Sequence, residues 1–247
     1  MFTGYFDDSG ATSTGVVVAC GWISSVEQRK QFDENWRFVL GKFELPYFHM
    51  KSLRQYKGPF QKFKDNLPLE TDLMQRLQAV IRIRAQKSIG CLVDVVAYEA
   101  LNREYRLREH FGDPFSLAGC VAIAKTYKWF DRMYPNDEIA FVFEAGTKGW
   151  GDLVDSAKRD FGVTPTKGDW EKLTPLQAAD FVAWENHRAY QKAKQANFGK
   201  LRFRGSFTQF IQHYGGEDWY VADEEQIRAL CCDALHNGEN AIERRLA

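Results

Sequence analysis

Carboxylates interrupt otherwise apolar segments at three widely separated places in the chain. Asp7 and Asp8 follow the aromatic run FTGYF, and Glu144 ends the apolar run IAFVF. Asp180 lies inside PLQAADFVAWE, among alanines and aromatic residues. A carboxylate in apolar surroundings carries a large desolvation cost unless it is paired or binds a cation. These four residues are therefore the first candidates for a chemical site.

A divalent cation would offset the repulsion among carboxylates that converge. Without a cation, neighbouring carboxylates raise one another's pKa values. Hard oxygen ligands without a His or Cys cluster favour Mg²⁺ or Mn²⁺ over Zn²⁺. Two such ions, roughly 4 Å apart, can activate water and stabilise the leaving oxygen of a phosphodiester. The residue types thus predict a metal-dependent nuclease or a related phosphoryl-transfer enzyme.

Each carboxylate also has an ordinary structural explanation. Asp before Ser-Gly is a common turn former, so Asp7 and Asp8 also fit a turn that closes the first strand. Glu144 fits a strand-end charge that reaches solvent, and Asp180 fits a salt bridge to a buried arginine. Asp is a poor residue for the middle of a helix, which makes Asp180 the hardest to explain in this way. Taken together, the four favour a metal site.

The elements expected in the first third of the chain are two strands, two helices and a loop. FTGYFDD and GVVVACGWI predict strands that the polar segment SGATST joins as a hairpin. Ser24 or Ser25 can cap a helix that ends near Gly41. The aromatic, basic segment 47–64 has poor periodicity and is expected to be a loop, and helical spacing of apolar residues returns over 68–87.

The remaining chain alternates between strands and helices. The expected elements, in chain order, are a strand SIGCLVDVVAY, helices over 99–112 and 113–134, a buried strand EIAFVFEAG, a helix over 149–162, a weak strand VTPT, a helix over 174–194 and a helical tail from about 223.

Without residues 24–87, three antiparallel strands precede alternating helices and strands, which is the element order of the ribonuclease H-like core. We therefore expect an α/β fold with a ribonuclease H-like mixed sheet flanked by helices. The chain, residues 1–247, is expected to form one such domain, with a helical insertion at about 24–87 and a C-terminal helical tail at about 223–247. A fold of this kind does not by itself establish a function.

The same residues resemble the bacterial family called domain of unknown function 3800, which has a ribonuclease H-like fold. Asp7-Asp8-Ser9-Gly10 is similar to its Asp-Glu-Ser-Gly pattern, YFHM at His49 to its strand-borne His, and FVFE at Glu144 to its central strand. Pro175 to Phe181 matches Pro-Leu-Gln-x-Ala-Asp followed by a large apolar residue.

The resemblance implies metal ligands at Asp7, Glu144 and Asp180. Asp8 stands where the family has Glu, so a helper or turn-forming role is expected for it. His49 would touch a phosphate or a water, or else be a hydrogen-bonded structural histidine. His187, two helical turns after Asp180, could reach the rim of the site or simply pack.

Basic and aromatic residues after His49 would suit a nucleic-acid backbone. The candidates for phosphate contacts are Lys51, Arg54 and Lys57, and Lys62 and Lys64 follow, interleaved with Tyr56, Phe60 and Phe63 as bases for stacking. A second basic run, KLRFRG, holds Lys200, Arg202 and Arg204. Charge runs are also common on solvated loops. The expected partner is DNA or RNA.

Composition limits the class of protein but leaves this function open. The 33 basic and 33 acidic residues give zero net charge, which excludes a uniformly basic nucleic-acid coat but not a local basic patch. The five cysteines form no CxxC pair, and Cys20, Cys91 and Cys120 fit the core. Without a signal peptide or an apolar run of 18 residues, we expect a cytoplasmic protein with no membrane partner.

Two rival functions remain. The chain could be a non-catalytic nucleic-acid-binding or defence-associated interaction protein on the same fold, whose binding would not need the acidic residues. It could also be an actin-like ATPase, since Asp8-x-Gly10-x-Thr12 and Gly146-Thr147 resemble phosphate loops. Against the ATPase, 247 residues are few for two such lobes, and a second glycine-rich phosphate loop is not evident.

Overall fold

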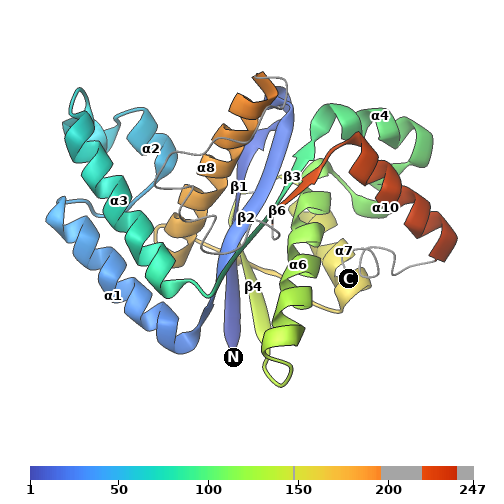
Figure 1. The fold of residues 1–247 in the computed structure, drawn as a ribbon, viewed down its shortest axis with the longest axis horizontal. Helices are drawn as coiled ribbons and strands as arrows, with labels where there is room; N and C mark the ends of the chain where they lie inside the picture. The colour runs from blue at the N-terminus through green and yellow to red at the C-terminus, as the bar shows by residue number, and fades with distance from the viewer. Residues whose placement is uncertain (147, 196–218, 238–247) are drawn as a thin grey trace.

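One six-stranded mixed sheet, with helices on both faces, runs through the computed structural model (Figure 1), which describes residues 1–146, 148–195 and 219–237. The strands are β1 (Phe2–Ala11), β2 (Val16–Ser25), β3 (Lys87–Asp94), β4 (Ile139–Glu144), β5 (Thr166–Gly168) and β6 (Trp219–Ala222). Their order is β5-β4-β1-β2-β3-β6. β2 is antiparallel to β1 and β3, and the other pairs are parallel. The expected α/β class is confirmed.

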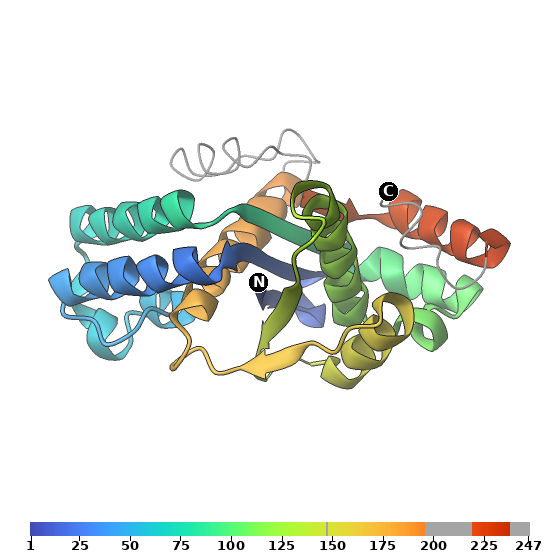
Figure 2. The same ribbon diagram turned by 90° about the horizontal axis from the view of Figure 1, so that it is seen from below.

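Two sets of helices cover the two faces of the sheet (Figures 1 and 2). The first face carries α1 (Val26–Lys42), α2 (Met50–Arg54), α3 (Leu67–Arg84) and α8 (Thr174–Gln195). The second face carries α4 (Val95–Tyr105), α5 (Leu107–Phe111), α6 (Pro114–Met133), α7 (Trp150–Phe161) and α10 (Glu224–Asn237).

The side-chain alternation of the strands divides the core between these two faces. Tyr5 and Cys20 pack under the first set of helices, whereas Phe6 and Ala19 pack under the second. This is the period of two that a strand buried on both faces requires. Cys20, Cys91 and Cys120 are buried free thiols, as predicted.

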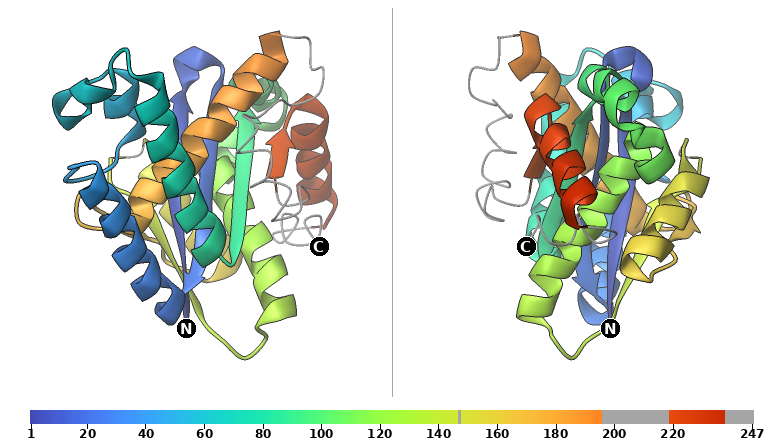
Figure 3. Two further views of the ribbon diagram at one scale, coloured as in Figure 1. Left: turned by 60° about the vertical axis from the view of Figure 1, so that its left-hand side comes forward. Right: turned by 90° about the vertical axis from the view of Figure 1, so that its right-hand side faces the viewer.

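Helix α8 lies diagonally across β1 and β2 (Figure 3). Ala178, Ala179 and Ala183 are fully buried, and such small side chains allow the helix to approach the sheet closely. Trp22 of β2 donates an indole hydrogen bond of 2.9 Å to the carbonyl of Pro175. The packed alanines and this hydrogen bond position α8 on the sheet, and with it Asp180.

The segment between β2 and β3 is more ordered than its sequence predicts. The expected loop over 47–64 contains α2 and a 3₁₀ turn, Gly58–Phe63. Phe60 and Phe63 are buried in the same core as α1, α3 and α8. The loop prediction was wrong here because aromatic burial, rather than helical periodicity, orders this short segment.

The C-terminal ends predicted for the first and third strands were wrong, whereas Glu144 ends β4 as predicted. β1 continues to Ala11, so Asp7 and Asp8 lie within a strand and not in its turn. β3 ends at Asp94, whose side chain accepts hydrogen bonds from the N–H groups of Val96 (2.9 Å) and Ala97 (3.2 Å). This side-chain cap starts α4, so the second half of SIGCLVDVVAY is helical.

The C-terminal part adds one strand that was not expected. β6 pairs with β3 before the predicted tail helix, which is α10. The weak strand lies at β5, about three residues after VTPT begins. Among the described residues, no helix is both long enough and apolar enough to cross a bilayer.

Candidate metal centre

Asp7 and Glu144 lie side by side because their strands are neighbours. β1 pairs with β4 in parallel, and Phe6 lies opposite Phe143, so the next residues along are Asp7 and Glu144. Tyr5, two residues before Asp7, packs under α8, and alternation turns the Asp7 side chain toward the same helix. The sheet therefore presents both carboxylates to α8.

The carboxylates of Asp7, Asp8 and Glu144 form a close group. Each offers one oxygen within 4.8 Å of the others. Asp7 is only 3% exposed, whereas Asp8 and Glu144 are partly exposed. The Asp8 N–H donates a 2.7 Å hydrogen bond to Asp7 Oδ1, which holds the Asp7 carboxylate in place. A set of three oxygens that is buried at one end and open at the other suits a hard divalent cation.

Acidic groups and burial dominate the environment of Asp7. Burial raises the pKa of Asp7 well above its ordinary value, a hydrogen bond with Glu144 raises it further, and the charges of Asp180, Glu144 and Asp8 add to the effect. A hydrogen bond between two carboxyl groups requires a shared proton. No cationic side chain of the described residues is among the groups that shift this pKa. A bound cation would displace that proton and supply the missing charge.

Asp180 approaches the same group from α8. Its Oδ2 accepts a 2.6 Å hydrogen bond from the N–H of Met50, the first residue of α2. Burial raises the pKa of Asp180 to about 7; the Met50 N–H opposes this, and the charges of Glu144 and Asp8 add to it. Asp180 is not one of the three residues whose oxygens lie within 4.8 Å of one another. The charges of Glu144 and Asp8 nevertheless raise its pKa, and its own charge raises the pKa of Asp7.

His49 lies next to this acidic group. Its ring stacks on Trp170 with a centroid distance of 4.7 Å and an interplanar angle of 18°, and its Nδ1 is 2.9 Å from the hydroxyl of Ser52. Burial lowers the pKa of His49; the charge of Glu144 opposes that shift and the charge of Lys51 adds to it. The imidazole is therefore neutral at pH 7 and close enough to Glu144 to respond to its charge.

His187 occupies a different environment, beside the hairpin of β1 and β2. Its Nε2 is 3.4 Å from the Thr14 hydroxyl, and a Cβ at Gly10 would lie 3.1 Å from its ring. Gly10 has a φ of +92°, a conformation that favours glycine. Burial lowers the pKa of His187, with no contribution from a carboxylate. The residue packs against the hairpin.

The three predicted phosphate contacts have unequal surroundings. Lys51 and Lys57 are exposed. Arg54 instead forms a 2.7 Å ion pair with the buried Glu70 and lies 4.9 Å from the ring centroid of Trp184. The guanidinium of Arg54 thus has a structural role.

The predicted stacking residues are not available to bases. Phe60 and Phe63 are buried in the core, so the stacking prediction was wrong for both. Tyr56 is half-buried against the same core. The second basic run, KLRFRG, lies outside the described residues.

Three groups near the site were not predicted from the sequence. They are the backbone N–H of Met50, the ring of Trp170 and the amide of Gln177, whose oxygen accepts from Phe48 N at 3.0 Å. Gln177 carried a usable signal, because it is a polar residue on the apolar face of α8, one turn before Asp180. Met50 acts through its backbone, which residue types do not reveal.

Comparisons of the chain with protein-family models, curated proteins and solved structures gave no match. The resemblance to domain of unknown function 3800 therefore stays a prediction that rests on the residues quoted for it.

Proposed function

We propose that this chain is a Mg²⁺- or Mn²⁺-dependent nuclease with a ribonuclease H-like fold. The observation that carries the proposal is the group formed by Asp7, Asp8 and Glu144, with oxygens within 4.8 Å of one another. Burial and mutual repulsion raise the pKa of Asp7, the innermost member. Such a group is costly without a cation and becomes favourable with one.

The strand order supports this fold assignment. The order β5-β4-β1-β2-β3, with only β2 antiparallel to its neighbours, is that of a ribonuclease H-like sheet. In that arrangement the carboxyl end of β4 lies beside the middle of β1. These two positions carry Glu144 and Asp7, and α8 adds Asp180. The resemblance to domain of unknown function 3800 is part of the same proposal.

The residues of the proposed site divide into ligands and supporting groups. Asp7, Asp8 and Glu144 would hold the ion, and Asp180 would complete its shell directly or through water. When bound, the ion supplies Lewis acidity for water activation and charge stabilisation. His49, neutral and beside Glu144, would orient a water or a phosphate oxygen.

The proposed substrate is a nucleic-acid backbone. Lys51 and Lys57 are exposed in the segment that follows His49, where they could contact backbone phosphates. The buried positions of Phe60 and Phe63 leave this segment without its predicted stacking residues. Backbone charge is therefore the recognition element that the segment can offer.

Cleavage assays on labelled DNA and RNA, single- and double-stranded, test the proposal. We expect cleavage with Mn²⁺ or Mg²⁺ and none with EDTA. Asp7→Asn and Asp180→Asn should abolish it while the circular dichroism spectrum stays unchanged. Asp94→Asn, at a carboxylate that contacts the other end of α8, is the matched control and should retain activity.

Two outcomes count against the proposal. The nuclease assignment fails if the wild-type chain cleaves none of these substrates with either ion. Salt-dependent binding that Asp7→Asn leaves intact, without cleavage by the wild type, would favour the non-catalytic nucleic-acid-binding alternative.

A further inference from the structure

Gln177 is a buried polar side chain beside the acidic group. It is 1% exposed and lies on α8 one turn before Asp180. Residues three apart on a helix share a face, so Gln177 and Asp180 both point toward the segment that leads into α2. A buried amide is stable only when its donors and acceptors are paired.

The amide of Gln177 connects three segments of the chain. Its oxygen accepts hydrogen bonds from the indole N–H of Trp36 on α1 (2.9 Å) and from the backbone N–H of Phe48 (3.0 Å). Its nitrogen donates to the carbonyl of Trp170 at 3.0 Å. Two donors at one end and a carbonyl at the other define the orientation of the amide.

Residues 48–50 are thus attached to α8 at two points. Gln177 holds the N–H of Phe48, and Asp180 accepts from the N–H of Met50. His49 lies between these two bonds, with its ring stacked on Trp170. Because Gln177 also holds the backbone of Trp170, one side chain positions both partners of the stack.

We infer that Gln177 is a positioning residue for the proposed metal site. It holds His49 against Trp170, beside Glu144, and brings the Met50 N–H to Asp180. The role in metal binding rests on the proposed function, whereas the role in positioning His49 and Met50 does not.

Proton NMR of the metal-free protein tests the positioning role. Stacking on Trp170 should shift the His49 imidazole protons upfield, and the short bond to Asp180 should shift the Met50 amide proton downfield. Gln177→Leu should reduce both shifts. Gln177→Asn, whose shorter amide cannot span all three partners, should reduce them as well and serves if the Leu variant does not fold.

Trp36→Phe is the matched control, because it removes one hydrogen bond to the same oxygen but keeps an aromatic ring against Phe48 and leaves the Phe48 N–H bonded to Gln177. It should leave both NMR shifts in place even if it lowers the melting temperature. Retention of both shifts in Gln177→Asn would overturn the positioning role, since the side chain would then be only a core residue.

Calorimetric titration with Mn²⁺ alone tests the link to the site. Loss of a group that supports metal ligands costs roughly 10- to 100-fold in affinity, which is the loss expected for Gln177→Asn. Trp36→Phe should bind as the wild type does. Unchanged affinity in Gln177→Asn, with its NMR shifts lost, would overturn the link. A wild-type chain that binds no Mn²⁺ would end the proposed function, and the NMR shifts would still decide the positioning role.

Discussion

Two carboxylate sites lie along α8, one around Asp7 and one at Asp94, and their surroundings are opposite. Asp94 ends β3, level with Ala11 at the end of β1, and Asp7 lies four residues earlier on β1; both strands pair antiparallel with β2. Helix α8 passes both, with Asp180 near Asp7 and Lys194 near Asp94. The comparison separates a carboxylate whose charge Lys194 balances from one whose pKa is raised by burial and by neighbouring acidic groups.

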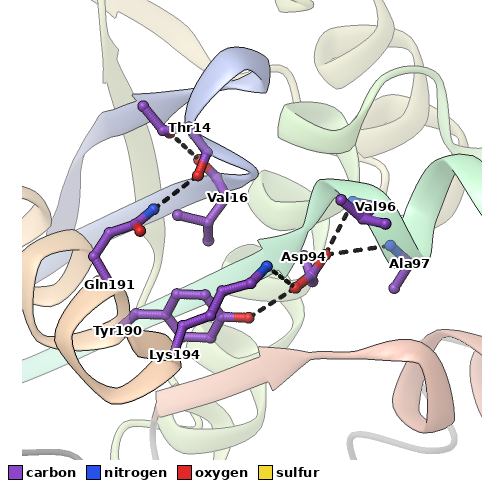
Figure 4. A network of polar contacts seen from close by, with 8 residues as sticks. All are labelled: Thr14, Val16, Asp94, Val96, Ala97, Tyr190, Gln191 and Lys194. Atoms are coloured by element: carbon purple, nitrogen blue, oxygen red, sulfur yellow. Dashed lines mark hydrogen bonds and ion pairs between the residues drawn. The ribbon is translucent and has the colours of Figure 1, made fainter. Parts of the chain in front are cut away.

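Asp94 is fully satisfied by protein groups (Figure 4). One oxygen caps α4, and the other accepts from the hydroxyl of Tyr190 at 3.0 Å and the ammonium of Lys194 at 2.8 Å. Burial acts to raise the pKa of Asp94, but hydrogen bonds from Lys194, Ala97 and Tyr190 outweigh it, so the pKa lies below its ordinary value. This carboxylate is stable as an anion and has a structural role.

Asp7 differs from Asp94 in its neighbours and in the direction of its pKa shift. Its neighbours are Glu144, Asp8 and Asp180, and each contribution to its pKa is upward. The C-terminal end of α8 is anchored to the hairpin as well as to Asp94, through a 2.8 Å hydrogen bond from Gln191 to the Thr14 carbonyl (Figure 4). Helix α8 thus brings a cation, Lys194, to Asp94 and a further carboxylate, Asp180, to Asp7, and under the proposed function only the second site binds a metal ion.

The largest expected difference between the two groups is their response to Mn²⁺. At a free concentration of one hundred times the dissociation constant, binding to the folded state stabilises it by about 2.7 kcal/mol. Thermal unfolding should show this gain for the wild type and for Asp94→Asn, but not for Asp7→Asn. An equal gain in Asp7→Asn would show that the ion binds elsewhere, and the proposed difference between Asp7 and Asp94 would then be wrong.

The second difference concerns stability without metal. Asp94→Ala removes a helix cap and a partly buried ion pair, so a loss of about 2 kcal/mol is expected. Urea unfolding measures it. Asp94→Asn keeps an oxygen for the cap and should lose less than half as much. If Asp94→Ala costs nothing, the network in Figure 4 is not structural.

The contrast between the two groups was only partly predictable from the sequence. Asp180 and Glu144 stood out because each interrupts an apolar element, which is a local signal. Asp94 gave no such signal: Val95 and Val96 continue a β-branched pattern, and the helix begins there only because the Asp94 side chain caps it. Two hydrogen bonds to one capping side chain outweigh the local propensity.

The segment between β2 and β3 was also only partly predictable from the sequence. Helices α1 and α3 follow from their periodicity, and the cap at Ser25 is as expected, with its hydroxyl accepting from Gln28 N at 3.3 Å. The short α2 spans five residues, too few for a periodic pattern. Its contact with Asp180 runs through a backbone N–H, which every residue except proline carries. The contact between the Met50 N–H and Asp180 can therefore be identified only from the tertiary structure.

The smallest expected difference is in the pH dependence of the metal-free protein. The pKa of Asp180 is about 7 in the folded state, against an ordinary value of 3.8, and the pKa of Asp7 is also raised. The folded state then binds more protons than the unfolded state between these values, so stability falls as pH rises from about 4 to about 8. Asp94, with a lowered pKa, acts oppositely: its contribution is present above its ordinary value and is lost as pH falls below it.

Asp7→Asn isolates this effect, because it removes one repelling charge and keeps the shape of the side chain. In urea unfolding without metal at pH 8, the variant should be more stable than the wild type by about 1 kcal/mol, and the gain should shrink toward pH 5 as the wild-type carboxyl groups become protonated. Asp94→Asn should show no such gain at any pH. If Asp7→Asn is destabilised at pH 8, the Asp7 carboxylate is balanced within the protein, as that of Asp94 is, and the argument for a cation there fails.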